Sequence, residues 1–283
     1  MKDKVTFLRI NMTDAAVVCI TNKRKTPATV LATRYIDASG CEITKQSIIG
    51  VDEAGRGPLF GRVYTAAVIL PAQPLSEEDK DSNFDFSLMK DSKKFHSEKK
   101  IQSVSEYIKT HPGVTWAITY EEADVIDRIN IRRATLQSMR ASIDAVMNKH
   151  AHSSKISDGS KIRSKLTSPS TYRNSEYMLL IDGNDFIPMG KFNQESGEME
   201  YIPHVCVEGG DNTYACIAAA SILAKVARDE YIEKLCDEYP VLDELYSLRG
   251  NKGYGAKKHL DGIREHGITQ WHRRSYGICK TFE

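Results

Sequence analysis

Two adjacent acids, Asp52 and Glu53, end an apolar run and directly precede a Gly-Arg-Gly triplet at residues 55–57. The run at residues 48–51 has the composition of a β-strand. Because strands are depleted in Asp and Gly, the acids are expected where the strand ends and the backbone turns. The glycines let the backbone bend and approach a ligand closely, and the arginine adds a permanent positive charge. For an isolated Asp-Glu pair, a surface turn with scattered charges is the alternative.

Two further acids stand at the ends of other apolar elements. Asp182 closes the run at residues 177–181, which is apolar on both faces as in a central strand. Ligands of open α/β sheets gather outside such strand ends. Asp211 lies just before the helical pattern of residues 214–235, where an N-cap is the alternative role, although a helix N-terminus also gathers ions. Asp229 is a rival for the fourth acid, but its place within the predicted helix favours an ion pair or a surface position.

Converging carboxylates repel one another, and repel a phosphate, unless cations neutralise them. Mg²⁺ suits such a site, because it takes hard oxygen ligands and binds through one or two carboxylates, water and substrate phosphate. Two such ions about 3.5–4 Å apart stabilise the attacking water and the leaving oxygen of a phosphodiester displacement. The acids therefore predict metal-dependent phosphodiester hydrolysis, with lysine clusters and Arg56 holding the backbone phosphates.

The surrounding pattern predicts the elements that position these residues. Strands are predicted at residues 48–51, 63–70, 114–119, 177–182 and about 199–207. Helices are predicted up to residue 108, at 121–149 and at 214–235, the longest from apolar residues spaced three and four apart. The short connection between the first two strands predicts an antiparallel hairpin.

Composition bounds the class of protein. The 283 residues are 41% hydrophobic, which is enough for one large or two ordinary domains, and the net charge of +1 requires any nucleic-acid surface to come from local clusters. The six cysteines form no C-x-x-C pair, which argues against a zinc site and favours buried, reduced thiols. No apolar run approaches the roughly 20 residues of a membrane span. We expect a cytoplasmic protein, or a nuclear one in a eukaryote, that is not secreted and has no membrane partner.

Three parts are expected along the chain. Residues 1–45 would be an N-terminal extension, residues 46–240 the part that carries the four acids, and residues 241–283 a C-terminal helical region. Within the middle part, residues 151–176 are rich in Ser, Lys and Thr and predict an exposed, flexible insertion. Tyr254 stands between two glycines flanked by lysines, where it can stack on a sugar or base, although a turn on a solvated face is the commoner role.

Six segments, taken together and in order, resemble type 2 ribonuclease H, the ribonuclease HII family. They are residues 50–58, 91–94, 181–183, 210–211, 218–229 and 252–255. The match spans roughly residues 46–276. It implies an α/β fold, with a ribonuclease H-like mixed sheet flanked by helices as the catalytic domain at residues 46–240 and a small C-terminal substrate-binding helical region at residues 241–283. It also implies a metal-dependent endonuclease that leaves 5′-phosphomonoesters, cleaves the RNA strand of RNA/DNA hybrids and incises 5′ to single ribonucleotides embedded in duplex DNA.

The resemblance also implies roles for individual residues. The catalytic and metal-binding acids would be Asp52, Glu53, Asp182 and Asp211, with Mg²⁺ or Mn²⁺ as cofactor. The substrate-binding residues would be Gly55, Arg56, Gly57, Lys93, Lys94 and Tyr254. The Gly-Arg-Gly loop would sense the ribose 2′-hydroxyl and the tyrosine would pack on the sugar at the RNA–DNA junction, which agrees with the 2′-hydroxyl being the group that distinguishes RNA from DNA. The arginine of that loop separates the chain from type 3 relatives.

Other functions stay open at this point. One is a non-catalytic or subunit-dependent nucleic-acid-binding protein of the same fold, against which the intact set of acids argues. Another is a metal-dependent nuclease for DNA junctions, which would have no need of a 2′-hydroxyl sensor. The chain has Gly209 where family members often have lysine, so one phosphate-facing cation is missing or supplied from elsewhere. We expect a monomer, with accessory subunits not excluded, that binds RNA/DNA hybrids and ribonucleotide-containing duplex DNA.

Overall fold

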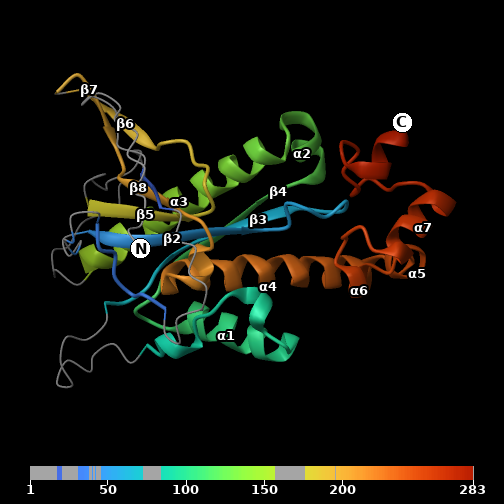
Figure 1. Cartoon of the computed structure of the whole chain (residues 1–283), viewed down its shortest axis with the longest axis horizontal. Helices are drawn as coiled ribbons and strands as arrows, with labels where there is room; N and C mark the ends of the chain where they lie inside the picture. Colours follow the sequence, from blue (N-terminus) through green and yellow to red (C-terminus); the bar gives the residue numbers. More distant parts are fainter. Residues whose placement is uncertain are drawn as a thin grey trace, which may run out of the picture.

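Strand β2 (Ser47–Ala54) lies in the middle of a six-stranded mixed sheet with the order β1-β8-β5-β2-β3-β4 (Figure 1). The computed structural model describes residues 18–20, 31–37, 40, 42, 46–72, 84–156, 176–194 and 196–282. The other strands of the sheet are β1 (Val18–Ile20), β3 (Val63–Ile69), β4 (Thr115–Glu121), β5 (Tyr177–Asp182) and β8 (His204–Val207). Strands β2, β3 and β4 are successively antiparallel, whereas β2, β5, β8 and β1 are parallel. The predicted hairpin is confirmed.

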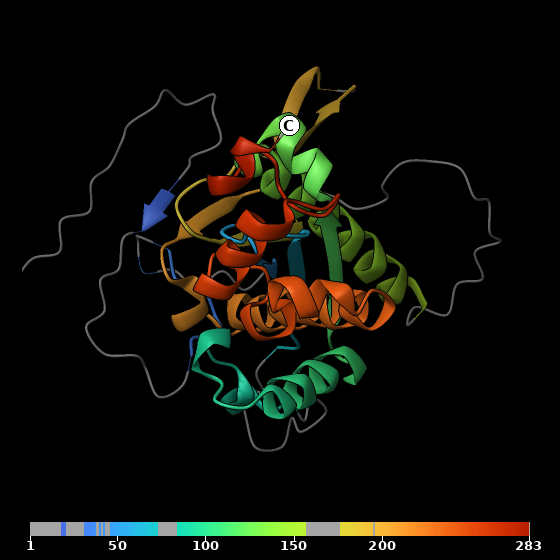
Figure 2. The same cartoon turned by 90° about the vertical axis from the view of Figure 1, so that its right-hand side faces the viewer.

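Helices cover both faces of this sheet (Figures 1 and 2). The α-helices are α1 (Glu98–Thr110), α2 (Ala123–Ile129), α3 (Ile131–Ile156), α4 (Ala215–Glu238), α5 (Val241–Tyr246), α6 (Leu248–Asn251) and α7 (Lys257–His266). Helix α3 packs on one face against side chains such as Ile49 and Val51. Helices α4 and α1 pack on the other against Ala66 and Val68. The mixed sheet flanked by helices is as the sequence predicts.

Helix α4 lies unusually close to β2 because both elements present small residues. A Cβ on Gly50 would fall 2.2 Å from the backbone carbon of Cys216, so only glycine fits there. The first turns of α4 contribute Ala215 and residues 218–220, all fully buried. This contact fixes the start of α4 beside the strand that carries the paired acids.

Two predicted elements are wrong in their bounds. The helix expected at 121–149 is broken at Asn130, whose φ of 68° interrupts the helical backbone and whose side chain accepts from the amide of Arg133. The strand expected at 199–207 is split before β8 by Pro203, which has no N–H to donate to a sheet. Its first part, β7 (Glu198–Tyr201), instead pairs with β6 (Gly190–Asn193) in a separate hairpin.

The predicted insertion and N-terminal extension fall mostly outside the described residues. Helix α3 continues to Ile156, so the start of the insertion is helical, and residues 157–175 are not described. Of the extension, β1 pairs with β8, and Leu31 packs in the core between the sheet and α4. The boundaries of the three proposed parts stay predictions.

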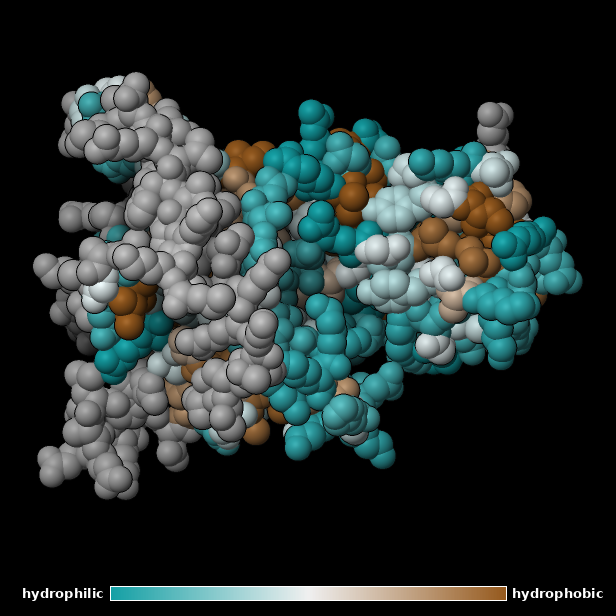
Figure 3. Space-filling view, viewed as in Figure 1, coloured by the Kyte–Doolittle hydropathy of each residue, from teal (hydrophilic) through white to brown (hydrophobic). Residues whose placement is uncertain are grey.

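The C-terminal region packs on the far half of α4 and on the loop after β2. Its core joins Phe60 to residues of α4, α5, α6 and α7, including Ile232 and Ile263. On the face seen in Figure 3, hydrophilic residues dominate the middle of the molecule and apolar atoms gather at the right-hand end, over this region. Cys216, Cys236 and Cys279 are buried free thiols, and Cys206 is buried as well. Among the described helices, none combines the length and the apolar character that crossing a membrane requires.

Candidate active site

Asp52 and Asp182 lie side by side on two neighbouring parallel strands. The last paired residues of β2 and β5 are Val51 and Ile181, so each acid is the next residue of its own strand. Asp52 is only 4% exposed and accepts a hydrogen bond from Ser221 of α4. The structure therefore brings together two acids that lie far apart in the sequence.

The sequence predicted that the strand ends at the two acids. In the structure, β2 ends there only on the side that faces β5. Asp52 and Glu53 stay paired with Ala66 and Thr65 of β3, while the pairing with β5 has already stopped. Since side chains alternate along a strand, Glu53 projects to the face opposite Asp52. There it lines a cavity of about 130 Å³ together with Asp182. The opening between β2 and β5, rather than a sharp turn of β2, gives both acids access to one place.

Asp211 joins this site through a short 3-10 turn, Gly210–Asn212, between β8 and α4. The amide of Gly210 donates to Oδ1 of Asp182 at 2.7 Å, and Asp211 itself is buried. The residue at the N-cap of α4 is Tyr214, which excludes that role for Asp211. The rival acid, Asp229, forms a 2.6 Å ion pair with Lys225 of the same helix.

A second set of polar residues supports Asp211, and the sequence analysis identified its lysines, Lys93 and Lys94, but not Asn212 or the role of Asp91. The Asn212 amide group donates to the carboxylates of Asp211 and Asp91 at 3.0 and 3.2 Å. Its oxygen accepts from Lys94, and Nζ of Lys93 lies 3.9 Å from Asp211. An Asp that precedes Ser-Lys-Lys is a turn-capping signal, and Asp91 does accept from the amide of Lys93 at 2.9 Å. That signal identifies the turn but not its place beside Asp211.

The carboxylates of the site make one another harder to ionise. Burial, followed by the charges of Asp182 and Glu53, raises the pKa of Asp52 well above its usual value. Burial and Glu53 also raise the pKa of Asp182. Burial and the neighbouring Asp182 and Asp91 raise the pKa of Asp211 to about 6. Four acids thus share a buried region with too little positive charge.

Nearby cations offset this repulsion only in part. Burial raises the pKa of Glu53, but the guanidinium of Arg56, 3.3 Å away, acts in the opposite direction. Burial would lower the pKa of Lys93, but Asp211 and the other acids outweigh it and raise the pKa. The remaining repulsion and the hard oxygen donors both fit a divalent cation such as Mg²⁺ or Mn²⁺. Among the described residues, no three Asp, Glu, His or Cys side chains are close enough together to coordinate one metal ion as they stand. The structure therefore places the candidate ligands near one another, but not in a complete coordination geometry.

The Gly-Arg-Gly loop follows directly on the acids. Gly55 has a φ of +92°, and a Cβ there would fall 2.3 Å from Nε of Arg228. Arg56 is half exposed. Tyr254 is 49% exposed, and a Cβ on Gly57 would lie 3.7 Å from its ring. The structure therefore places the ring of Tyr254 beside the Gly-Arg-Gly loop. This is where the ring must lie if both are to contact one ribose.

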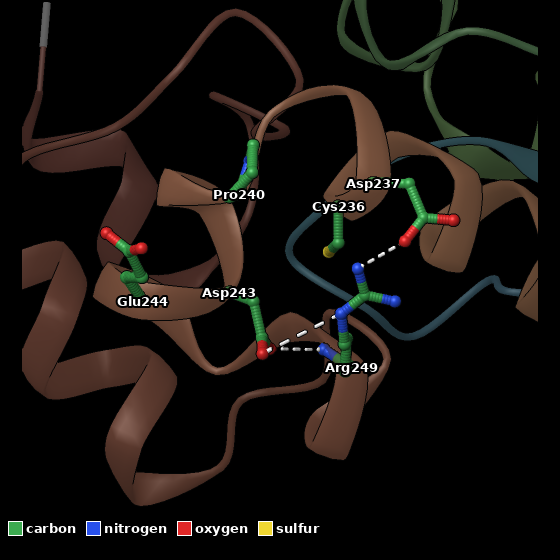
Figure 4. Close-up of a pocket in the computed structure, with 6 residues that line it drawn as sticks. All are labelled: Cys236, Asp237, Pro240, Asp243, Glu244 and Arg249. Carbon is green, nitrogen blue, oxygen red and sulfur yellow. Dashed lines mark hydrogen bonds and ion pairs between the residues drawn. The ribbon is translucent and has the colours of Figure 1, made fainter.

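A hollow elsewhere on the molecule shows no comparable chemistry. It lies at the end of α4, with a volume of about 350 Å³ (Figure 4). Its Arg249 pairs with Asp237 and Asp243, so these two acids already have a positive partner (Figure 4).

Comparisons of the sequence with known proteins show the family of the chain. The family model for ribonuclease HII matches residues 49–279. The chain is 37% identical to ribonuclease HII of Bacteroides thetaiotaomicron over 81% of this chain and 88% of that protein, and 33% identical to ribonuclease HII of Trichormus variabilis over 92% and 95%. Among solved structures, ribonuclease H2 of Pyrococcus horikoshii is similar at 20% identity, with a TM-score of 0.48 over 83% of this chain and 96% of that one. The chain therefore belongs to the ribonuclease HII family and is a ribonuclease H.

Proposed function

We propose that this ribonuclease H cleaves the RNA strand of RNA/DNA hybrids and incises 5′ to single ribonucleotides in duplex DNA, leaving 5′-phosphates. The observation that carries the proposal is the meeting of Asp52 and Asp182 where the pairing of β2 with β5 stops, close to a Gly-Arg-Gly loop. Acids for phosphodiester chemistry and a loop suited to a sugar thus share one surface.

The acids would hold divalent cations. We assign this role to Asp52, Glu53, Asp182 and Asp211. When bound, two Mg²⁺ or Mn²⁺ ions would activate the attacking water and neutralise the leaving oxygen. The chain itself supplies the orientation, because Ser221 holds Asp52 and the amide of Gly210 holds Asp182.

The loop and the tyrosine would recognise the ribose. Gly57 is exposed, so its backbone can approach a 2′-hydroxyl, the only chemical difference between a ribose and a deoxyribose, while the buried Gly55, with a φ of +92°, gives the loop its turn. Tyr254 offers a half-exposed ring on the other side of Gly57, suited to packing on a sugar. A deoxyribose would leave the loop without its hydrogen bond, which favours incision at a ribonucleotide.

Cations beside the acids would bind the phosphates. Lys93 is 82% exposed and reaches within 3.9 Å of Asp211. It supplies positive charge beside Asp211, two residues after Gly209, the position where family members often have lysine. Lys94, which donates to Asn212, and Arg56, 3.3 Å from Glu53, would add further positive charge for a polyanion.

The test compares substrates for the full chain with Mg²⁺ or Mn²⁺. We expect incision of an RNA/DNA hybrid and of a DNA duplex with one ribonucleotide, no incision of the all-DNA duplex, and no activity after chelation. Cleavage of the hybrid alone would remove the proposed junction activity. Cleavage of all-DNA duplex at an equal rate would remove the proposed sugar recognition, and binding without any cleavage would favour the non-catalytic alternative.

A further inference from the structure

One guanidinium from the C-terminal tail organises the loop that follows β2. Arg273 is fully buried, and its three nitrogens donate hydrogen bonds of 2.7–3.0 Å to backbone carbonyls of that loop. The five acceptors are the carbonyls of Gly55, Arg56, Pro58, Gly61 and Arg62. The loop is therefore wrapped around a single side chain that comes from more than 200 residues later in the chain.

The bonds of Arg273 explain why an arginine is needed. Its planar fork presents five N–H donors in fixed directions, whereas a lysine has three donors on one atom. Within the described part of the chain, no carboxylate forms an ion pair with it. Burial of an unpaired charge is costly, so the carbonyl dipoles must provide the compensation. Burial lowers the pKa of Arg273 to about 10, which keeps it charged at neutral pH.

A second buried arginine ties the same loop to the segment that carries Tyr254. Arg228 of α4 donates to the carbonyl of Lys252 at 2.7 Å and lies directly behind Gly55. The backbones are also joined, because the amide of Leu59 donates to the carbonyl of Gly253 at 2.9 Å. Movement of the loop around Arg273 would therefore move the tyrosine with it.

We propose that Arg273 is a positioning residue that sets the geometry of residues 55–62 and, through it, the recognition of the ribose. The inference rests on the proposed function of the Gly-Arg-Gly loop. Arg273 does not reach the surface and touches no substrate. Its contribution is to hold the carbonyls and amides of the loop in the one arrangement that meets a 2′-hydroxyl.

The test measures both steady-state and single-turnover incision of a duplex with one ribonucleotide by Arg273→Lys and Arg273→Ala. Because a misplacement of about 1 Å can cost 10²-fold, we expect kcat to fall by about 100-fold in both, with KM little changed. Millimolar guanidinium should restore part of the activity of Arg273→Ala, while ammonium at equal ionic strength should not. The matched control is Arg274→Ala, an exposed neighbour, which should stay within about twofold of the wild type.

The outcomes separate this inference from the proposed function. Failure of the wild type to incise the ribonucleotide duplex would contradict the proposed function itself. A wild type that incises, with a folded Arg273→Lys that keeps its kcat, would overturn the role of Arg273. A folded Arg273→Ala that guanidinium does not restore would overturn it as well. If the alanine variant does not fold, Arg273→Lys decides, because it keeps the charge and most of the volume.

Discussion

The amide of Gly210 donates a 2.7 Å hydrogen bond to Oδ1 of Asp182, which joins the turn that carries Asp211 to the end of β5. Asp182 in turn lies next to Asp52, one residue beyond the last pair of β2 and β5. Strand pairing thus places Asp52 and Asp182, whereas the turn that carries Asp211 is held by the side chain of Asp182. The side chain of Asp52 can therefore be changed without loss of this bond, whereas a change at Asp182 would remove it.

Asp52→Asn should remove activity while it stabilises the metal-free protein. The pKa of Asp52 is raised above its usual 3.8, so at neutral pH its ionisation destabilises the folded state, and asparagine removes that effect. Loss of a metal ligand should cost several kcal/mol of transition-state stabilisation, about 10³-fold or more in rate. Thermal unfolding in a chelator and in Mg²⁺ checks the prediction: the ion should raise the Tm of the wild type more than that of the variant.

The control for this change is Asp229→Asn. It removes an acid that is paired with Lys225 on the surface of α4, so activity and the response to Mg²⁺ should be nearly unchanged. A loss of activity in this variant equal to that of Asp52→Asn would show that the fourth acid was misassigned.

Gly55→Ala should damage both stability and cleavage. The new Cβ would fall 2.3 Å from Nε of Arg228 in a backbone with a φ of +92°. We expect a loss of about 1–3 kcal/mol in unfolding free energy and, because the loop must shift, about 100-fold in kcat. Gly197→Ala is the matched control, since its φ is +72° but nothing lies within 4 Å of its Cβ. Urea unfolding and single-turnover incision of both variants separate backbone strain from the clash.

Tyr254→Ala should slow incision at a single ribonucleotide more than it weakens duplex binding. The ring is 49% exposed, so its loss should change the unfolding free energy by less than about 0.5 kcal/mol. Tyr254→Phe keeps the packing surface and should retain most of the rate. If Tyr254→Ala reduced hybrid cleavage, single-ribonucleotide incision and duplex binding by the same factor, the proposed role of the tyrosine would be wrong.

The buried pair His259 and His272 should make the protein less stable in acid. The amide of Thr269 donates to Nδ1 of His272, so Nε2 of His272 donates to His259, whose Nδ1 donates to the carbonyl of Tyr254. This chain of hydrogen bonds requires both rings to be neutral. Burial, with the neighbouring His259, lowers the pKa of His272 to about 3, and burial lowers that of His259.

The sign of the effect follows from these shifts. Between the unfolded value of about 6.5 and the lowered folded values, the unfolded state binds more protons, so stability falls as the pH drops below about 6.5. The acids of the active site have raised pKa values, so their protonation stabilises the folded state as the pH drops. The effect of the histidines must therefore be read from the difference between the wild type and a histidine variant. Urea unfolding at pH 7.5 and 5.5 should show a smaller acid loss for His272→Asn than for the wild type. The exposed His96→Asn should keep the wild-type difference, and identical differences for all three proteins would contradict the prediction.

Much of the site could be predicted because its residues break local patterns. Acids such as Asp182 follow apolar strands, and Gly55 follows a strand at a position where a turn is expected. Their place in the sequence was therefore enough to predict that they belong to a site. The break at Asn130 was missed because the apolar spacing continues across it, and a single left-handed residue leaves that spacing intact. Arg273 was missed for a different reason. Arginine is usually exposed, and the residues next to it in the sequence do not indicate that it donates to five backbone carbonyls of a distant loop.

The most direct test of the account is the position of the nick made by the wild-type chain, with Mg²⁺ or Mn²⁺, in an end-labelled DNA duplex that holds one ribonucleotide. The account predicts one cut immediately 5′ to the ribonucleotide, no cut in the all-DNA duplex, and no cut by Asp52→Asn. Cuts that ignore the ribonucleotide, or an unchanged cut by Asp52→Asn, would contradict it.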